Sequence, residues 1–152
     1  MKRFTPALHF LACALFTAAC TAERGAQATD SDPGSVENVE WKLVALDGAP
    51  VTGASGGAPT ITLSSKDKRV TGFAGCNQLT GGYELKSEQL HFTAIATTRM
   101  FCPDPNPETA LLRALDATSR WKVEDRTLDL LDASGKSVAR WTVTVIESGE
   151  KS

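Results

Sequence analysis

The sequence predicts a mainly β (α+β) fold, a curled antiparallel sheet or barrel-like roll with one helix. Two observations support this class. Short segments that alternate apolar and polar residues recur along most of the chain, and polar turns separate them. One later stretch, residues 107–118, instead spaces its leucines as a helix does. Helix content is therefore low and strand content high.

The strands are expected to be short and joined by turns. The first covers residues 39–46, where Trp41 and Leu43 alternate with Lys42 before a turn at Asp47. A glycine-rich loop, residues 49–58, follows it. The remaining strands are expected at residues 60–63, 69–73, 83–85, 90–93, 120–124, 127–131 and 138–145.

The helix has a recognisable beginning. Asn106 suits the N-cap, Pro107 suits the first helical position, and Glu108 lies where the helix dipole favours a negative charge. The helix should end near Thr118. Its apolar face carries Leu111, Leu112 and Leu115.

The N-terminal residues resemble a bacterial lipoprotein signal. Lys2 and Arg3 precede an apolar run, residues 7–16, which is too short to anchor the chain across a bilayer. Small residues then lead to Cys20, although Thr17 stands where such signals usually have Leu. We expect cleavage after residue 19 and acylation of Cys20, for example with palmitate; simple secretion is the alternative.

The domain organisation follows from composition. Residues 20–38 hold the lipidated cysteine and a polar stretch too poor in apolar residues to form a core, so they should act as a flexible tether. The folded domain should cover residues 39–146, with a short tail at 147–152. Thr21, rather than Asp, after the cysteine favours the periplasmic face of the outer membrane.

Charge excludes one class of partner. Loss of residues 1–19 changes the net charge from −2 to about −4, and no basic cluster remains to bind phosphates. Nucleic-acid binding is therefore not expected. The glycines between residues 72 and 82 lack the Lys-Ser/Thr and the helix of a phosphate loop. No cofactor or metal site is expected, and we expect a monomer.

Two cysteines remain after the leader is removed and Cys20 is acylated. Cys76 and Cys102 would lie in an oxidising compartment, which favours a disulfide between them. Such a bond closes a loop of about 26 residues and would stabilise the fold by about 3–4 kcal/mol. A reactive or metal-binding thiol pair is the alternative, for which His91 is the one remaining histidine.

Two motifs resemble the paired signatures of the META domain family, the family of the heat-inducible lipoprotein HslJ. One is a glycine-punctuated Gly-Cys-Asn turn within residues 72–83, and the other is Thr-Arg-Met-x-Cys at residues 98–102. Phe101 departs from the pattern, because Ala is commoner there. The matching residues are Gly75, Cys76, Asn77, Gly82, Tyr83, Thr98, Arg99, Met100 and Cys102.

The resemblance covers nearly all of the expected domain, including Trp41 near its start and Glu108 at the start of the helix. It implies a small, strongly curved β-roll with one helix packed against it. It also implies settings of heat induction, novobiocin resistance and, in some parasites, virulence. We therefore expect a non-catalytic stress-protection or binding module, whose envelope-protein or small-molecule ligand is not specified. The alternatives are an inhibitor or assembly factor for an envelope enzyme, or a cysteine-based redox or hydrolytic enzyme.

Several residues near the motifs could serve a site. Arg99 could form a structural ion pair with Glu108 or bind an anionic ligand. Asn77 is expected to adopt a left-handed turn or to bond to nearby backbone. A nucleophilic Cys76 would need His91 as its base, although a lone histidine on a strand is more often a surface or packing residue. The tryptophans, on expected strands, are interpreted as core or half-buried residues: Trp41, Trp121 and Trp141.

Overall fold

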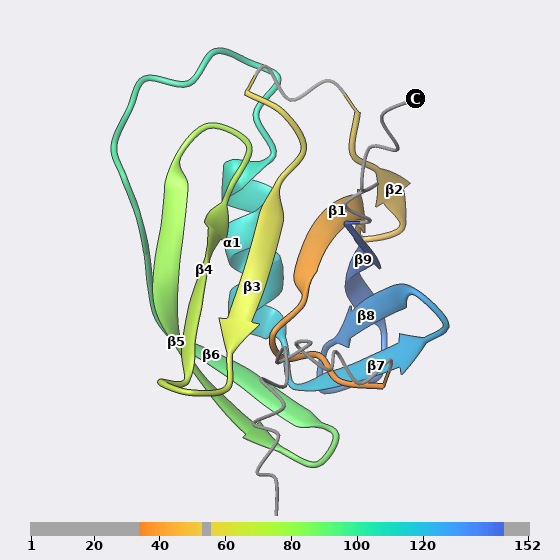
Figure 1. Ribbon diagram of the computed structural model, residues 1–152. Coiled ribbons are helices and arrows are strands. Elements are labelled where there is room, and N and C mark those ends of the chain that lie inside the picture. The colour runs from red at the N-terminus through yellow and green to blue at the C-terminus, as the bar shows by residue number, and fades with distance from the viewer. Residues whose placement is uncertain (1–33, 53–55, 145–152) are drawn as a thin grey trace, which may run out of the picture. The chain divides into compact units, whose positions relative to one another are not determined.

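The computed structural model describes residues 34–52 and 56–144, all of which belong to one compact unit, Ser31–Ser152. The predicted leader, Cys20, residues 20–33 of the predicted tether and the tail at 147–152 lie outside the described residues. The end of the predicted tether belongs instead to the folded domain, because Val36 is buried in the core and its carbonyl accepts a hydrogen bond from Trp41 Nε1 at 2.9 Å. Figure 1 shows the elements, which are β1 (Glu40–Leu46), β2 (Ala49–Pro50), β3 (Thr60–Ser64), β4 (Arg69–Phe73), β5 (Gln78–Lys86), β6 (Gln89–Thr97), α1 (Glu108–Ala117), β7 (Arg120–Glu124), β8 (Thr127–Leu131) and β9 (Ser137–Val143).

The strands form one antiparallel sheet that curves until it meets itself. Their order is β2-β1-β3-β4-β5-β6-β7-β8-β9, and an additional pairing of β1 with β9 closes the ring. The ring is weakest between β6 and β7, which pair only at Gln89 and Arg120. The expected class, a strongly curved antiparallel sheet with one helix, is confirmed.

The core lies inside this ring. Inward residues of the strands are buried, among them Leu63, Leu130 and the fully buried Trp141. Helix α1 contacts β1, β6, β8 and β9 and adds Leu111 and Leu115 to the same cluster. Full burial of such a side chain is worth about 1.5–3 kcal/mol, so these contacts position the helix start and the loop that precedes it.

The helix begins one residue later than predicted, because Pro107 rather than Asn106 is its N-cap and Glu108 is its first residue. Its end, near Thr118, is as predicted. The backbone N–H of Glu108 donates to Asn106 Oδ1 at 3.0 Å, and that of Leu111 donates to the carbonyl of Pro107 at 2.9 Å. Thr118 is the C-terminal cap, with its backbone in an extended conformation. The tryptophan interpretation is also confirmed: Trp41 and Trp141 are buried, and Trp121 is half-buried.

The strand bounds differ from expectation at three places. The loop at 49–58 contains the short strand β2, which pairs with β1. Strands β5 and β6 are nine residues each, several residues longer than expected. Strand β5 continues through Gly81 because glycine allows β6 to pack closely against it there. A Cβ at position 81 would lie 2.5 Å from Ile95 Cδ1. The last strand ends at Val143, two residues earlier than expected.

Among the described residues, no helix has the length and apolar character needed to cross a bilayer.

Candidate functional site

The two sequence motifs meet at one end of the sheet, beginning with the tight turn between β4 and β5. The backbone N–H of Ala74 donates to the carbonyl of Asn77 at 2.8 Å. Gly75 has φ of +101°, a conformation that glycine adopts without strain. A Cβ there would also lie 2.9 Å from Pro107 Cγ, so the turn packs directly against the residue before the helix.

A disulfide joins this turn to the loop after β6. Cys76 and Cys102, which are 26 residues apart in the sequence, are bonded to each other, as predicted. The bond links the loop that follows β6 to the loop that precedes β5. It therefore restrains the backbone of residues 98–102 from one side.

Asn77 holds the same loop from the other side. Its side chain is almost fully buried, and its Oδ1 accepts hydrogen bonds from Thr98 Oγ1 at 2.9 Å and from the backbone N–H of Met100 at 2.8 Å. Its Nδ2 donates to Glu108 Oε2 at 2.9 Å and lies 3.1 Å from Cys102 Sγ. One amide thus connects the turn, the loop and the helix, and each bond to a buried group is costly to break.

Glu108 completes this connection from the first turn of α1. Its Oε1 accepts a hydrogen bond from Thr97 Oγ1 at 3.1 Å, and its Oε2 accepts the one from Asn77. A carboxylate in this position also benefits from the positive end of the helix dipole. The residues of this site, which we call the brace, are Cys76, Asn77, Thr97, Thr98, Cys102 and Glu108.

One expectation about the brace is wrong, and a second is confirmed in one of its two alternatives. Glu108 forms no ion pair with Arg99, because its carboxylate is occupied by Asn77 and Thr97. Arg99 is exposed and has no ion-pair or hydrogen-bond partner among residues 34–52 and 56–144. Asn77 does not adopt a left-handed conformation, because Gly75 supplies the positive φ of this turn. The other alternative, a side-chain bond to backbone, is confirmed, because Asn77 Oδ1 accepts from the backbone N–H of Met100.

The brace presents two apolar side chains to solvent. Phe101 is 94% exposed and Met100 is 59% exposed. In the described part of the chain, Val44 is the one other large hydrophobic residue that is exposed. Together with Arg99 they form the segment Arg99–Phe101, which we call the presented loop. In the sequence, the one sign of this exposed loop was Phe101, which stands where the resembled family more often has Ala.

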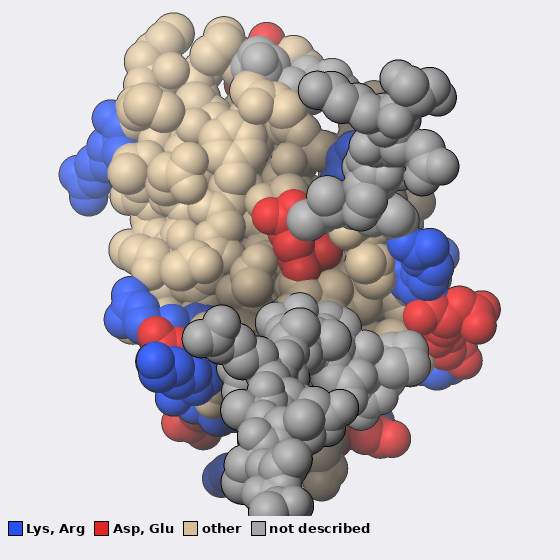
Figure 2. Space-filling model, in the orientation of Figure 1, with Lys and Arg blue, Asp and Glu red and all other residues tan. Residues whose placement is uncertain are grey.

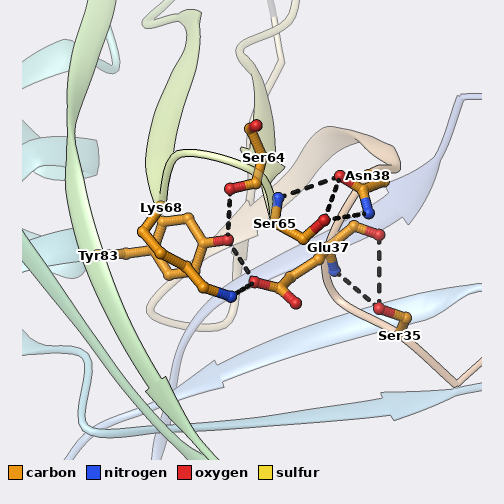
Figure 3. A network of polar contacts seen from close by, with 7 residues as sticks. All are labelled: Ser35, Glu37, Asn38, Ser64, Ser65, Lys68 and Tyr83. Carbon is orange, nitrogen blue, oxygen red and sulfur yellow. Dashed lines mark hydrogen bonds and ion pairs between the residues drawn. The ribbon is translucent and has the colours of Figure 1, made fainter.

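The other two signature residues lie elsewhere. Tyr83 and Gly82 are in the second half of β5, away from the turn that precedes this strand. The Tyr83 hydroxyl donates to Glu37 Oε1 and lies 2.8 Å from the carbonyl oxygen of Ser64, and Lys68 Nζ donates to the same carboxylate oxygen at 2.6 Å (Figure 3). This second cluster joins the beginning of the domain to the turn between β3 and β4.

Charge interactions in the second cluster shift two pKa values. Burial alone would raise the pKa of Glu37, but the hydrogen bonds from Lys68 and Tyr83, with the charge of Lys68, hold it below its ordinary value. Burial, the hydrogen bond to Glu37 and the negative charges nearby raise the pKa of Tyr83. Sequence reasoning missed this cluster because Glu37 is 31 residues from Lys68 and 46 from Tyr83.

The site offers no arrangement for cysteine catalysis. Cys76 lies just before β5, whereas His91 pairs with Glu84 near the far end of that strand. At about 3.4 Å per residue this separation is about 20 Å, so His91 cannot serve Cys76 as a base. Within the described residues, no three His, Cys, Asp or Glu side chains gather closely enough to bind a metal ion.

These features define a small ring-shaped β domain with a disulfide-braced loop. The META domain profile matches residues 34–144, so the chain belongs to the META domain family. An NMR structure of a protein from Burkholderia xenovorans is similar, with a TM-score of 0.61, 28% identity, and coverage of 80% of this chain and 97% of that one. A second NMR structure, with a TM-score of 0.56 and 22% identity, covers 71% and 91% and shows the fold alone. No curated protein sequence matches the chain.

Proposed function

We propose that this protein is a cell-envelope lipoprotein that carries its META domain as a non-catalytic binding module with a role in stress protection. The lipoprotein-like leader and Cys20 support membrane anchoring, and the polar stretch after Cys20 supports a tethered domain. Membership in the META domain family supports the stress setting, because members are associated with heat induction and antibiotic resistance. The periplasmic face of the outer membrane is the favoured location.

The observation that carries the binding proposal is the exposure of Phe101. An aromatic side chain that is 94% exposed contributes little to the core, yet the disulfide and Asn77 hold its backbone in place. Arg, Met and aromatic residues are the types enriched in the centres of protein interfaces, and all three occur in the presented loop. A restrained loop also loses little conformational entropy on binding.

The position of the presented loop favours a protein partner over the membrane that anchors the chain. The described chain begins beside the second cluster, at the turn between β3 and β4. The presented loop lies at the opposite end of these strands, beyond the far ends of β4 and β6 (Figure 1). A chain tethered through its N-terminus would therefore direct Phe101 away from the tether.

An inhibitor or assembly factor for an envelope enzyme is a second candidate. A protruding, disulfide-braced loop with an aromatic tip has a shape that can enter another protein's cleft, which supports this reading. A redox or hydrolytic enzyme is a less favoured third candidate, because the disulfide leaves no thiolate to react. Reduction of the bond would have to precede any such chemistry.

Photo-cross-linking in intact cells tests the proposal. A photoreactive amino acid at position 101 should form a discrete adduct with a protein, whereas one at Lys66, exposed in the turn at the opposite end of the sheet, should not. Both positions are exposed, so labelling efficiency is matched. Absence of any adduct from position 101, or equal adducts from both positions, would refute a binding role for the presented loop.

A further inference from the structure

The sparse pairing between β6 and β7 leaves a notch on the surface, separate from the presented loop. Beyond Gln89, β6 has no strand on its β7 side and faces α1. Between them lies a notch of about 200 Å³, lined by Phe92, Ala94, Ile95, Leu112 and Asp116. A cavity of roughly 150 Å³ lined by Leu, Ile and Phe can hold a benzene molecule, so this notch has room for one phenyl ring.

The notch carries an unpaired charge and a strained residue. The Asp116 carboxylate is exposed on its rim and forms no ion pair or hydrogen bond with any residue that the structure describes. Ala94 has φ of +48°, where an alanine is strained, and it lies in an irregularity of β6 opposite Gly81. The other non-glycine residues with positive φ in the described chain lie outside strands. Strain of this kind tends to occur at functional sites.

The notch and the presented loop are complementary. The loop offers an exposed phenyl ring at Phe101 and an unpaired cation at Arg99. Four of the five residues that line the notch are apolar, and the fifth, Asp116, offers an unpaired carboxylate. Within one chain they do not meet, because Phe101 is 94% exposed. Residues 92–98, from the notch to the loop, hold no Asp, Glu, Lys, Arg or His, so two copies facing each other there would bring no like charges together.

We propose that a second copy of this chain fills the notch: Phe101 of each protomer enters the notch of its partner, and Arg99 faces Asp116 across the contact. This rests on the proposed function, since it names a partner for the presented loop. Ile95 in the notch and Phe101 in the loop are six positions apart in the sequence, a separation of about 20 Å where the chain is extended. A two-fold axis crossing the strand near Thr97 exchanges them.

This arrangement forms a closed dimer with two equivalent contacts. It differs from the monomer expected from the sequence, which could not reveal that β6 lacks a neighbour along most of one side. The dimer would also cover both presented loops. A further partner would then have to compete with the second copy for Phe101.

Sedimentation equilibrium of residues 21–152, over a wide range of concentration, tests the proposal. These residues include the whole described domain. We expect a reversible monomer–dimer equilibrium. Phe101→Ala should raise the dimer dissociation constant at least about 100-fold, because two rings lose burial and each is worth at least about a factor of ten. Val44→Ala, which truncates another exposed hydrophobic residue on β1, is the matched control and should change nothing.

Charge reversal sharpens the test. Arg99→Asp and Asp116→Arg should each weaken the dimer, and the double variant should restore it, because the ion pair is rebuilt with opposite polarity. Both side chains are exposed, so these variants should fold, as circular dichroism can verify. A monomer at every concentration, a dimer indifferent to Phe101→Ala, an unrescued double variant or an open series of oligomers would each overturn the proposal. A hetero-adduct from position 101 together with a monomer would retain the binding function and reject the second copy.

Discussion

Asn77→Asp is the sharpest single perturbation of the brace, because it changes one group and almost no volume. The substitution keeps the oxygen that accepts from Thr98 and from the backbone of Met100. It replaces the Nδ2 donor, 2.9 Å from Glu108 Oε2, with a second oxygen. Losing a hydrogen bond to a charged group costs about 1.5–3 kcal/mol, and two adjacent carboxylates repel. We expect the free energy of unfolding to fall by about 3–5 kcal/mol at neutral pH.

The matched rescue is Glu108→Gln in the same chain. The new amide at position 108 can donate to the carboxylate at position 77, which rebuilds the bond in the opposite direction. Urea unfolding followed by tryptophan fluorescence should then show a coupling free energy of at least about 2 kcal/mol between the two substitutions. The loss of stability in Asn77→Asp should also shrink in acid. Repulsion between the carboxylates at positions 77 and 108 exists only where both are ionised, so protonation of either one removes it.

If Asn77→Asp unfolds within about 0.5 kcal/mol of the wild type at neutral pH, the amide does not connect the loop and the helix energetically. If Glu108→Gln fails to restore stability, the loss in Asn77→Asp has another origin. Asn77→Ala does not distinguish these cases, because it removes every bond at once.

Four further predictions concern the disulfide, Glu37, Ala94 and Cys20. Cys76→Ser and Cys102→Ser should each lower the free energy of unfolding by about 3–4 kcal/mol, and the double variant by the same amount, in urea titrations; additive losses would show that the cysteines act separately. Glu37→Gln should lower stability by up to about 1 kcal/mol at neutral pH. That deficit should vanish as pH falls through the lowered pKa of Glu37, because a depressed carboxyl pKa stabilises the fold only above it; a deficit that persists in acid would contradict this. Ala94→Gly should raise stability by about 0.5–1 kcal/mol by removing strain at positive φ, and a lower melting temperature would argue against it. Cys20→Ala should leave unprocessed precursor without acyl labelling; normal processing would reject the lipoprotein assignment.

Most of the fold follows from local patterns in the sequence. Alternation located the strands around Trp41 and Trp141, and the sequence Asn-Pro-Glu located the start of the helix within one residue. Local patterns could not show that β5 continues through Gly81 and Gly82. Glycine is a poor strand former in isolation, and only the close packing of β6 against those positions explains its presence.

The site was predicted in part. The cysteine pairing and the importance of the Gly-Cys-Asn turn could be read from the sequence. The predicted ion pair between Arg99 and Glu108 was wrong. Opposite charges in a sequence do not show which way the two side chains point, and the Glu108 carboxylate is bonded to the buried amide of Asn77. The exposure of Phe101 depends on which way a braced loop faces. The lack of a neighbouring strand along most of one side of β6 depends on how the ring closes. Neither feature could be predicted from the sequence.

The brace depends on the bond between Cys76 and Cys102, which joins the presented loop to the turn before β5. The most direct test is the intact mass of residues 21–152, exported to the periplasm and alkylated before or after reduction. We expect no alkylation of the native protein and two alkylated thiols after reduction. Two thiols that alkylate freely without reduction would contradict the brace and return a redox or nucleophilic role to Cys76.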